Sequence, residues 1–390
     1  ILISMPSQKS YNVFTVSILG FLFTLHAVFP AYISSTFLAQ FTGEESVGLV
    51  YSVSAILAIV SFFGLYRVLN RIGNYRTALL LMSLEFIALI GLSVFNSGWL
   101  VIPLFAIIFV AVALVGFNID LFLEEVSNEK ATGKIRGQFL TVVNIAWIVA
   151  PILTSMIMTN GDYWKIYLTA AIVLLPTIYL THHNLRGFID PKYPKINLKT
   201  TIRQIKSDTN IFGVFVVSFL MQFFFAWMVI YTPLYLHDHI HFSWKEIGTM
   251  FSIMLLPFVF IELPLGRLAD SRFGEKEIMS IGLIIVALST AMMSFVVDAN
   301  VVLWTALLFT TRGGAAMIEI MTETNFFKKI SLTQANITSV FRAVRPLANV
   351  VSPIIAILLL PIISFKFIFA VLGLIMFLGL RYSLALEDTR

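Results

Sequence analysis

The chain has 390 residues, of which 58% are hydrophobic and 12% are charged, and its mean hydropathy is +0.91. A soluble domain is about 45–50% apolar, so this composition excludes a water-soluble globular protein and indicates one whose solvent is lipid. The chain has no cysteine, which excludes disulfides, thiolate metal sites and cysteine nucleophiles. We expect neither a cofactor nor a bound metal, because no set of His, Asp and Glu residues has ligand spacing.

Apolar runs of roughly 20 residues, the length that crosses a bilayer as a helix, recur along the whole chain. In chain order we expect spans at 11–39, 46–68, 77–96, 100–126, 138–159, 166–183, 210–236, 246–267, 277–297, 300–326, 334–360 and 365–386. Long continuous runs favour helices over the short alternating strands of a membrane barrel. The sequence predicts an all-α membrane protein with about twelve spans, the first of which is retained rather than cleaved as a signal peptide.

Basic residues lie mainly in the loops on one side of these spans. The exceptions are three lysines in loops on the other side and three arginines inside spans: Lys165, Lys245, Lys366, Arg312, Arg342 and Arg345. The positive-inside rule makes the basic side cytoplasmic, so we expect both termini in the cytoplasm and a plasma (inner) membrane of bacterial type. The net charge of +5 then reflects topology, and nucleic-acid binding is not expected.

The longest polar break, at 182–210, is basic and divides the chain into two sets of six spans. We expect one six-helix bundle at 1–183, a cytoplasmic linker at 184–209 and a second bundle at 210–390. Within the linker, residues 198–205 are interpreted either as a short amphipathic helix on the anionic leaflet or as a solvated basic tether.

An internal repeat relates the two sets of spans. The landmarks are Gly64 with Gly266 and Pro151 with Pro353, each 202 residues apart, and Pro30-Ala-Tyr32 with Pro233-Leu-Tyr235, which are 203 apart. Such duplication is typical of two homologous bundles around one path through the membrane. We therefore expect the bundles to superpose about an axis along the membrane normal.

The loop between spans 8 and 9 carries the most specific motif, Gly266-Arg-Leu-Ala-Asp270-Ser-Arg272-Phe-Gly274-Glu-Lys276. It resembles the loop signature of the major facilitator superfamily, with one extra residue between Asp270 and Gly274. The equivalent loop between spans 2 and 3 keeps glycines and basic residues but lacks the acid. The resemblance implies two six-helix bundles that alternate access, and we expect Asp270 near Arg136 or the free N–H groups at the start of span 5.

By that resemblance, spans 1, 4, 7 and 10 line a central cavity. The candidates for substrate contact are then His26, Asn118, Gln222, Trp227, Tyr231 and Arg312. For His26, a structural hydrogen bond is an equal alternative. The aromatic residues of span 7 suit a wide apolar cavity, although in so phenylalanine-rich a chain they also suit packing and lipid contact.

Ionisable residues inside the spans are functional candidates, because each costs roughly 2.5–3.5 kcal/mol on insertion scales. Arg312, Glu319 and Glu323 share one face of span 10, and the two arginines of span 11 lie at the depth of those acids. Pairing between spans 10 and 11 is either a permanent cluster or a gate. The candidates for proton coupling or gating are Glu85, Asp120, Glu319, Glu323, Arg342 and Arg345, with helix packing as the alternative for Glu85.

Spans 5 and 11 each carry small residues before a proline. The motifs are Ala146-Trp-Ile-Val-Ala150-Pro151 and Ala348-Asn-Val-Val-Ser352-Pro353. They loosely resemble an antiporter signature of drug exporters, but small residues and proline also explain close helix crossing and bending.

The sequence predicts a monomeric secondary active transporter that is proton-coupled and alternates access. Its expected cargo is a small organic or amphipathic solute, and both import and efflux are open as the direction of transport. A lipid or lysolipid flippase of the same fold is the alternative within transport. A membrane-embedded enzyme would need a nucleophile, a metal set or a phosphate cradle at one membrane face, and no such constellation is evident. We therefore expect no enzymatic activity.

Overall fold

The computed structural model describes residues 12–126, 132–158, 161–191, 198–261, 264–265, 274–329 and 335–387. These ranges form helices, with no strand among them. Ten of the described helices are long and apolar enough to cross a membrane. The places of the two other predicted spans, 8 and 11, are taken by α10 with α11 and by α15, so the expectation of an all-α membrane protein with about twelve spans is confirmed.

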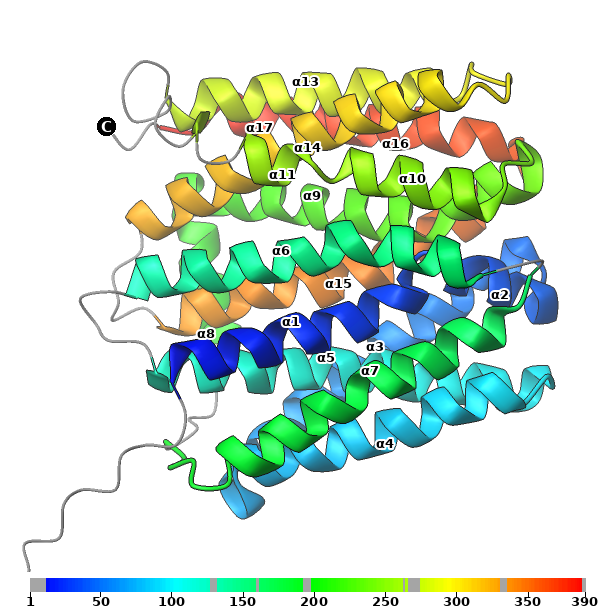
Figure 1. The fold of residues 1–390 in the computed structure, drawn as a ribbon. Helices are drawn as coiled ribbons and strands as arrows, with labels where there is room; N and C mark the ends of the chain where they lie inside the picture. Colours follow the sequence, from blue (N-terminus) through cyan, green and yellow to red (C-terminus); the bar gives the residue numbers. More distant parts are fainter. Residues whose placement is uncertain are drawn as a thin grey trace, which may run out of the picture.

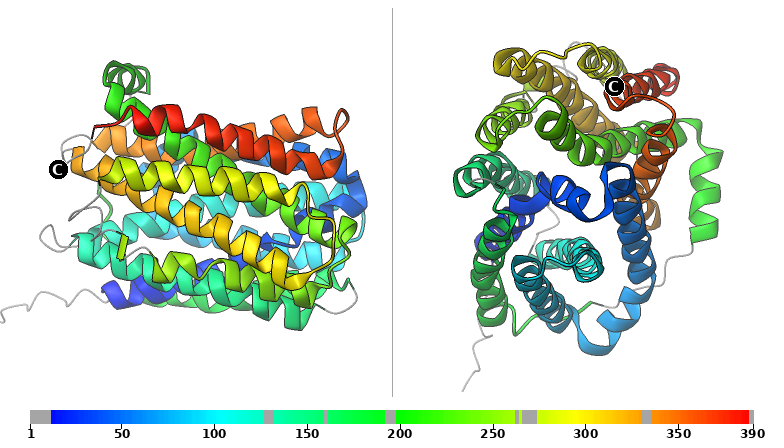
Figure 2. Two further views of the ribbon diagram at one scale, coloured as in Figure 1. Left: turned by 90° about the horizontal axis from the view of Figure 1, so that it is seen from above. Right: turned by 90° about the vertical axis from the view of Figure 1, so that its right-hand side faces the viewer.

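The first bundle contains α1 (Val13–Ala31), α2 (Ser34–Thr42), α3 (Glu44–Ile72), α4 (Asn74–Val94), α5 (Gly98–Val126), α6 (Thr132–Ile157) and α7 (Tyr163–Asn184). The second contains α9 (Thr209–Leu234), η1 (Tyr235–His239), α10 (Trp244–Met254), α11 (Pro257–Phe260), α13 (Glu275–Met293), α14 (Val301–Lys329), α15 (Ala335–Leu359), η2 (Phe365–Phe367), α16 (Ile368–Leu378) and α17 (Leu380–Leu384). The bundles lie side by side with their helices roughly parallel to one direction (Figures 1 and 2). They meet where α3 packs against α15 and α6 packs against α10.

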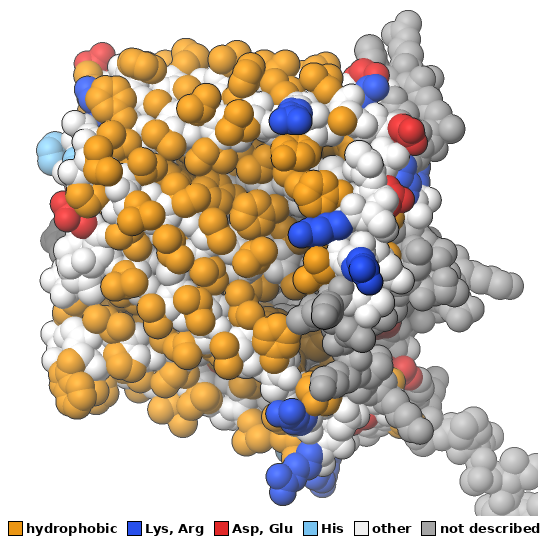
Figure 3. Space-filling view, turned by 180° about the vertical axis from the view of Figure 1, so that it is seen from behind, with side chains coloured by type: hydrophobic (Ala, Val, Ile, Leu, Met, Phe, Trp, Pro, Cys, Tyr) orange, Lys and Arg blue, Asp and Glu red, His pale blue; other side chains and the backbone are white. Residues whose placement is uncertain are grey.

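We call the end of the bundles that holds the start of α1 and the end of α17 the terminal end, and the opposite end the distal end (Figure 1). Between the two ends the visible face is covered by apolar side chains, and Lys and Arg gather toward the terminal end (Figure 3). Large apolar residues such as Leu80, Ile87 and Leu288 are exposed on the spanning helices. A wide exposed apolar belt is what a bilayer would cover.

Two predicted spans are broken at the distal end, contrary to the expectation of single helices at 11–39 and 210–236. In the first, α1 ends at Ala31 after Pro30, and α2 starts at Ser34. In the second, α9 ends at Leu234 after Pro233 and continues as the π-helical turn η1. Proline removes a helix hydrogen bond and clashes with the preceding turn, so the repeated Pro-x-Tyr motif produces a comparable break in each bundle.

The linker contains a short helix, α8 (Leu198–Ser207), which lies outside the bundles and across their helix direction at the terminal end (Figure 2). It packs against α9 and α15. Thr201 and Ile205 face inward and are buried, whereas Ile202, Arg203 and Lys206 are exposed. Of the two interpretations of this segment, the structure has the amphipathic helix; its contact with anionic lipid stays a prediction.

An acid from the segment after α7 occupies the start of α4, where the first-bundle loop lacks the acid of the signature. The backbone N–H of Asn74 donates to Asp190 Oδ1 at 2.6 Å. Gly73 has a φ of +83°, and a Cβ at this position would overlap the Asp190 carboxylate. Only glycine fits here, and the carboxylate meets the partial positive charge of a helix N-terminus.

We expect Asp190→Ala to lower the melting temperature of the purified protein, because losing a capping carboxylate costs about 1 kcal/mol. Differential scanning fluorimetry in detergent measures this shift. The matched control is Glu124→Ala, which removes an exposed carboxylate near the end of α5. Equal melting temperatures for the two variants would show that Asp190 contributes nothing to the start of α4.

Candidate functional site

The bundles touch most closely where a glycine of one meets a proline turn of the other. A Cβ on Gly48 of α3 would overlap the Tyr231 hydroxyl and lie 3.1 Å from the carbonyl oxygen of Pro353. A Cβ on Gly248 of α10 would lie 2.6 Å from the carbonyl oxygen of Pro151. Small residues let helix backbones approach in this way, and the two prolines are equivalent positions of the internal repeat.

A serine one turn after each glycine donates a hydrogen bond to the helix of the other bundle. Ser52 Oγ donates to the Val350 carbonyl at 3.1 Å, and Ser252 Oγ donates to the Ile148 carbonyl at 2.8 Å. Each acceptor lies three residues before the proline of its helix. Because proline disrupts the helix hydrogen bonds of the preceding turn, a carbonyl in that turn is open to a second donor.

We name this double contact the distal clasp and define it by four side-chain positions and four carbonyls: Gly48, Ser52, Gly248 and Ser252 with the carbonyls of Pro353, Val350, Pro151 and Ile148. Two further contacts lie at its rim. His239 Nε2 is 2.9 Å from Glu44 Oε2, and the rings of Tyr163 and Trp244 are 6.1 Å apart. The sequence analysis missed the clasp, although the signal was available as Gly-x-x-x-Ser repeated 200 residues apart.

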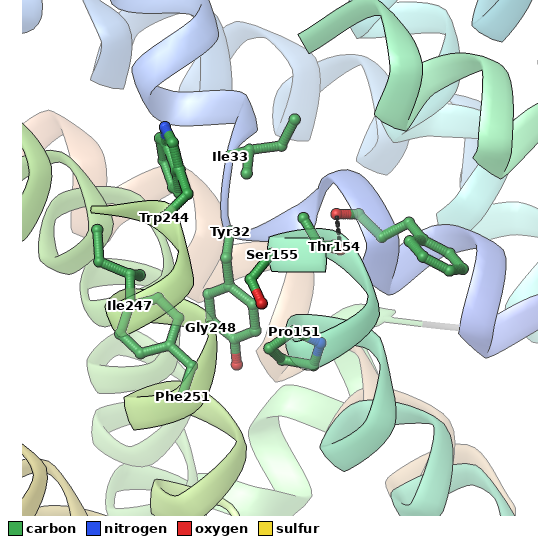
Figure 4. Close-up of a pocket in the computed structure, with 10 residues that line it drawn as sticks. Tyr32, Ile33, Pro151, Thr154, Ser155, Trp244, Ile247, Gly248 and Phe251 are labelled. Atoms are coloured by element: carbon green, nitrogen blue, oxygen red, sulfur yellow. Dashed lines mark hydrogen bonds between the residues drawn. The ribbon is translucent and has the colours of Figure 1, made fainter. Parts of the chain in front are cut away.

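A small cavity adjoins the second half of the clasp, between α1, α6 and α10 (Figure 4). Tyr32 lies between Pro151 and Phe251, with its ring centroid 4.8 Å from that of Phe251. Thr154 Oγ1 donates to the Phe29 carbonyl at 3.0 Å. The cavity measures about 10 Å³, the room that one water molecule needs, so side chains nearly fill this part of the interface.

Arg312 of α14 is buried next to aromatic rings of α9. Its side chain is 3% exposed, and its guanidinium carbon lies 5.5 Å from the ring centroid of Phe224 and 5.1 Å from that of Phe225. Its Nε has no hydrogen-bond partner among the described residues.

Trp227 and Tyr231 follow Phe224 at one and two turns along α9, and both are fully buried. Their ring centroids are 5.6 Å apart. The Trp227 Nε1 has no hydrogen-bond partner in the described part of the chain. The third candidate of this helix, Gln222, is half-buried and falls on another face of α9. Arg312, Trp227 and Tyr231 therefore belong to one buried region near the contact between bundles.

Two residues of the first bundle that were predicted to line the cavity form contacts within that bundle, and their contact with a substrate stays a prediction. His26 Nε2 lies 2.7 Å from Glu85 Oε1, with both side chains at 1% exposure or less. His26 Nδ1 and Glu85 Oε2 have no partner among the residues described. Asn118 is buried, and its carbonyl accepts a hydrogen bond from Asn74 Nδ2 at 3.0 Å. Histidine on α1 and glutamate on α4 thus form a buried titratable pair that separate assignments of the two residues did not foresee.

The remaining charged candidates lie toward the terminal end. Asp120 and Glu319 are half-buried, whereas Glu323 and Arg345 are exposed. The side chain of Arg342 lies outside the described residues, so pairing between α14 and α15 stays a prediction.

The loop motif is described only in part. Gly274 is the N-cap of α13 and Lys276 lies in its first turn, while Gly266, Asp270, Arg272 and the side chain of Arg136 lie outside the described residues. A contact that the sequence analysis missed joins Lys328 Nζ to the buried Glu275 Oε1 at 2.8 Å, and it ties the end of α14 to the start of α13. No cluster of potential metal ligands occurs within the ranges described.

Comparison with solved structures places the fold among membrane transporters. One similar structure is a bacterial homologue of the human lysosomal transporter Spinster in an inward-facing, unoccupied conformation, with a TM-score of 0.68, 11% identity and coverage of 97% of this chain and 94% of that chain. Another is a mutant of the nucleoside transporter NupG, with a TM-score of 0.77, 14% identity and coverage of 96% and 99%. At such low identity the likeness concerns the fold alone.

Sequence comparison gives the family. No curated protein matches the chain in sequence. The family model of the Major Facilitator Superfamily matches residues 15–330 and 214–388, which together span nearly the whole chain. The signature loop, the internal repeat, the two helical bundles and this match agree, and the chain belongs to the Major Facilitator Superfamily.

Proposed function

We propose that the protein is a secondary active carrier that works by alternating access, with the distal end outside the cell and both termini in the cytoplasm. The gathering of Lys and Arg toward the terminal end supports this orientation. The net charge is then a consequence of topology in a plasma membrane of bacterial type.

The observation that carries the proposal is the symmetry of the distal clasp. Each bundle supplies one Gly-x-x-x-Ser helix and receives the other on a proline turn. These two equivalent contacts hold the bundles together at the distal end. They would separate when one bundle rocks against the other. An interface of small residues and single hydrogen bonds suits such motion, because breaking these contacts costs little free energy.

We further propose that the carrier is proton-coupled and that its cargo is a small organic or amphipathic solute. The buried pair of His26 and Glu85 supports proton coupling, since a histidine and a carboxylate held inside a membrane bundle are the groups that exchange protons in such carriers. The pair makes one direct contact, and the second polar atom of each side chain has no partner among the residues described.

A disulfide or short thiol-specific bridge between Glu44→Cys and His239→Cys should stop transport. These side chains meet across the bundles at the rim of the clasp and are each about one-third exposed, and the chain has no cysteine of its own to interfere. Uptake of a panel of labelled organic solutes into proteoliposomes, with imposed and collapsed pH gradients, gives the readout. Reduction of the bridge should restore uptake.

The matched control is Asp162→Cys with Lys165→Cys, a contacting pair at the same end but within α7 and its N-cap. Bridging this pair leaves the bundles free to move, so uptake should continue. Full transport by the protein bridged at Glu44 and His239 would refute alternating access at the clasp. Accumulation that is equal with and without a pH gradient would refute proton coupling.

A further inference from the structure

Arg312 carries a buried charge that the described protein does not pair. The guanidinium stays protonated at any physiological pH, and its side chain is 3% exposed in the middle of a membrane helix. No described carboxylate lies within ion-pair distance of it. Glu319 lies seven residues further along α14, which is two turns of the helix from Arg312, and it has a further interaction of its own. A buried charge of this kind needs a partner at some stage of the working cycle.

The rings of Phe224 and Phe225 pack against the guanidinium of Arg312 but do not accept hydrogen bonds from its N–H groups. Both ring faces lie within 5.5 Å of its central carbon, a geometry in which the ring quadrupole attracts the cation. Ring faces accept no directed hydrogen bond comparable to that of a carboxylate, and the Nε–H has no partner among the described residues. The planar fork of N–H donors is therefore oriented by the rings and available at its edge.

Trp227 offers a second hydrogen-bond donor in this region. Trp227 lies one turn along α9 from Phe224, is fully buried, and its Nε1–H has no described partner. Tryptophan can only donate, so a ligand here must accept. Tyr231, whose ring centroid lies 5.6 Å from that of Trp227, places its hydroxyl against Gly48 of the first bundle. A ligand bound at Arg312 would therefore contact the surface where the bundles meet.

We infer that Arg312 anchors a monoanionic organic substrate, a carboxylate whose apolar or aromatic body lies against Phe224 and Phe225. The planar fork matches the two oxygens of a carboxylate. An organic amine would be repelled by the guanidinium, and a doubly charged phosphate would leave one negative charge uncompensated in an apolar site. This inference rests on the proposed carrier function and specifies the class of its cargo.

Binding to the purified full-length protein tests the substrate class directly. The probes are 3-phenylpropanoate, its amide, the corresponding amine and phenyl phosphate, with thermal stabilisation and isothermal titration as readouts. We expect the carboxylate to bind at least about tenfold more tightly than the amide, a difference typical of one charge-assisted contact, and we expect no binding of the amine.

Variants of this site locate the binding. Arg312→Gln should abolish carboxylate binding, and Arg312→Lys should weaken it by about tenfold or more, because lysine is a point charge without the planar fork. Phe225→Ala keeps the cation but removes one ring. It should weaken the binding of 3-phenylpropanoate more than the binding of acetate, which has no aromatic body. The control is Arg203→Gln on α8, which removes an exposed arginine far from the region and should bind as the unaltered protein does.

Equal binding of the carboxylate and its amide by the unaltered protein would overturn the inference, and so would the absence of any carboxylate binding. Tighter binding of phenyl phosphate would overturn it in favour of a dianion site. These comparisons need no variant, so they hold even if Arg312→Gln fails to fold. If the bridge between Glu44→Cys and His239→Cys stops transport but the protein binds no carboxylate, the protein is a carrier of another substrate class.

Discussion

Replacing Gly48 and Gly248 together with leucine should open the distal end of the protein. Neither glycine has room for a side chain, since even a Cβ would overlap the opposite helix or its neighbours. Overpacking costs about 1–3 kcal/mol at each site. The cost falls on the closed state alone, because the opposite helix moves away when the clasp separates. Two such sites shift the ratio of open to closed molecules by at least about tenfold.

Distances between spin labels measure this shift without any substrate. Labels on Glu45→Cys and Lys245→Cys report the distal end, one from each bundle and both at exposed positions. Labels on Glu124→Cys and Glu277→Cys report the terminal end in the same way. In the doubly substituted protein we expect longer distances for the distal pair and shorter distances for the terminal pair, the inverse relation that alternating access requires.

The matched control for this experiment is Gly116→Leu in α5. A Cβ at Gly116 meets no atom within 4 Å, so leucine there adds the same volume within a membrane helix without touching the clasp. Its distances should equal those of the unaltered protein. Unchanged distal distances in the variant with both clasp glycines replaced would mean that the clasp does not hold the bundles together.

Removing one member of the pair of His26 and Glu85 should be more damaging than removing both. Glu85→Ala leaves a histidine with no described partner in the core of the first bundle, and losing one partner of a buried pair costs about 3–5 kcal/mol. We expect little folded protein from either single variant. Replacing both residues with leucine removes the polar groups together, which is often neutral for stability, so size-exclusion chromatography should show recovered monodisperse protein.

Transport separates a coupling role of this pair from a packing role. The protein with leucine at both positions should fold but lose solute accumulation driven by a pH gradient. The control is His182→Ala, which breaks an exposed contact between His182 Nδ1 and the Tyr75 hydroxyl at 2.8 Å and should change neither yield nor accumulation. If the doubly substituted protein still accumulates solute with the pH gradient, the pair serves packing only.

Hydropathy predicted most of the helices, but their interruptions needed more than apolar runs. A helix in lipid must satisfy its backbone internally and present apolar side chains, and that requirement acts on each segment by itself. The breaks after Pro30 and Pro233 were concealed, because apolar residues continue on both sides of each proline. The repeated Pro-x-Tyr motif identified equivalent positions without showing that the chain bends there.

For the charged candidates too, the sequence predicted positions but not contacts. The spacing of residues predicted that Arg312 shares one face of span 10 with two acids. Its ring partners Phe224 and Phe225 belong to another helix and became known only from the packing of α9 against α14. His26 and Glu85 were weighed as separate candidates. Their contact joins residues 59 positions apart, and it depends on how α1 and α4 are rotated about their axes.

Composition and local motifs were enough to predict that the chain lies in lipid, how many spans it has, that it contains an internal repeat and which family it resembles. Which residues meet followed only from the packing of the helices. These contacts are the distal clasp, the buried pair of His26 and Glu85, the packing of Arg312 against Phe224 and Phe225, and the cap of α4 by Asp190. Each helix forms in lipid because of its own backbone and apolar side chains, whereas contacts between helices depend on side-chain fit between distant parts of the chain.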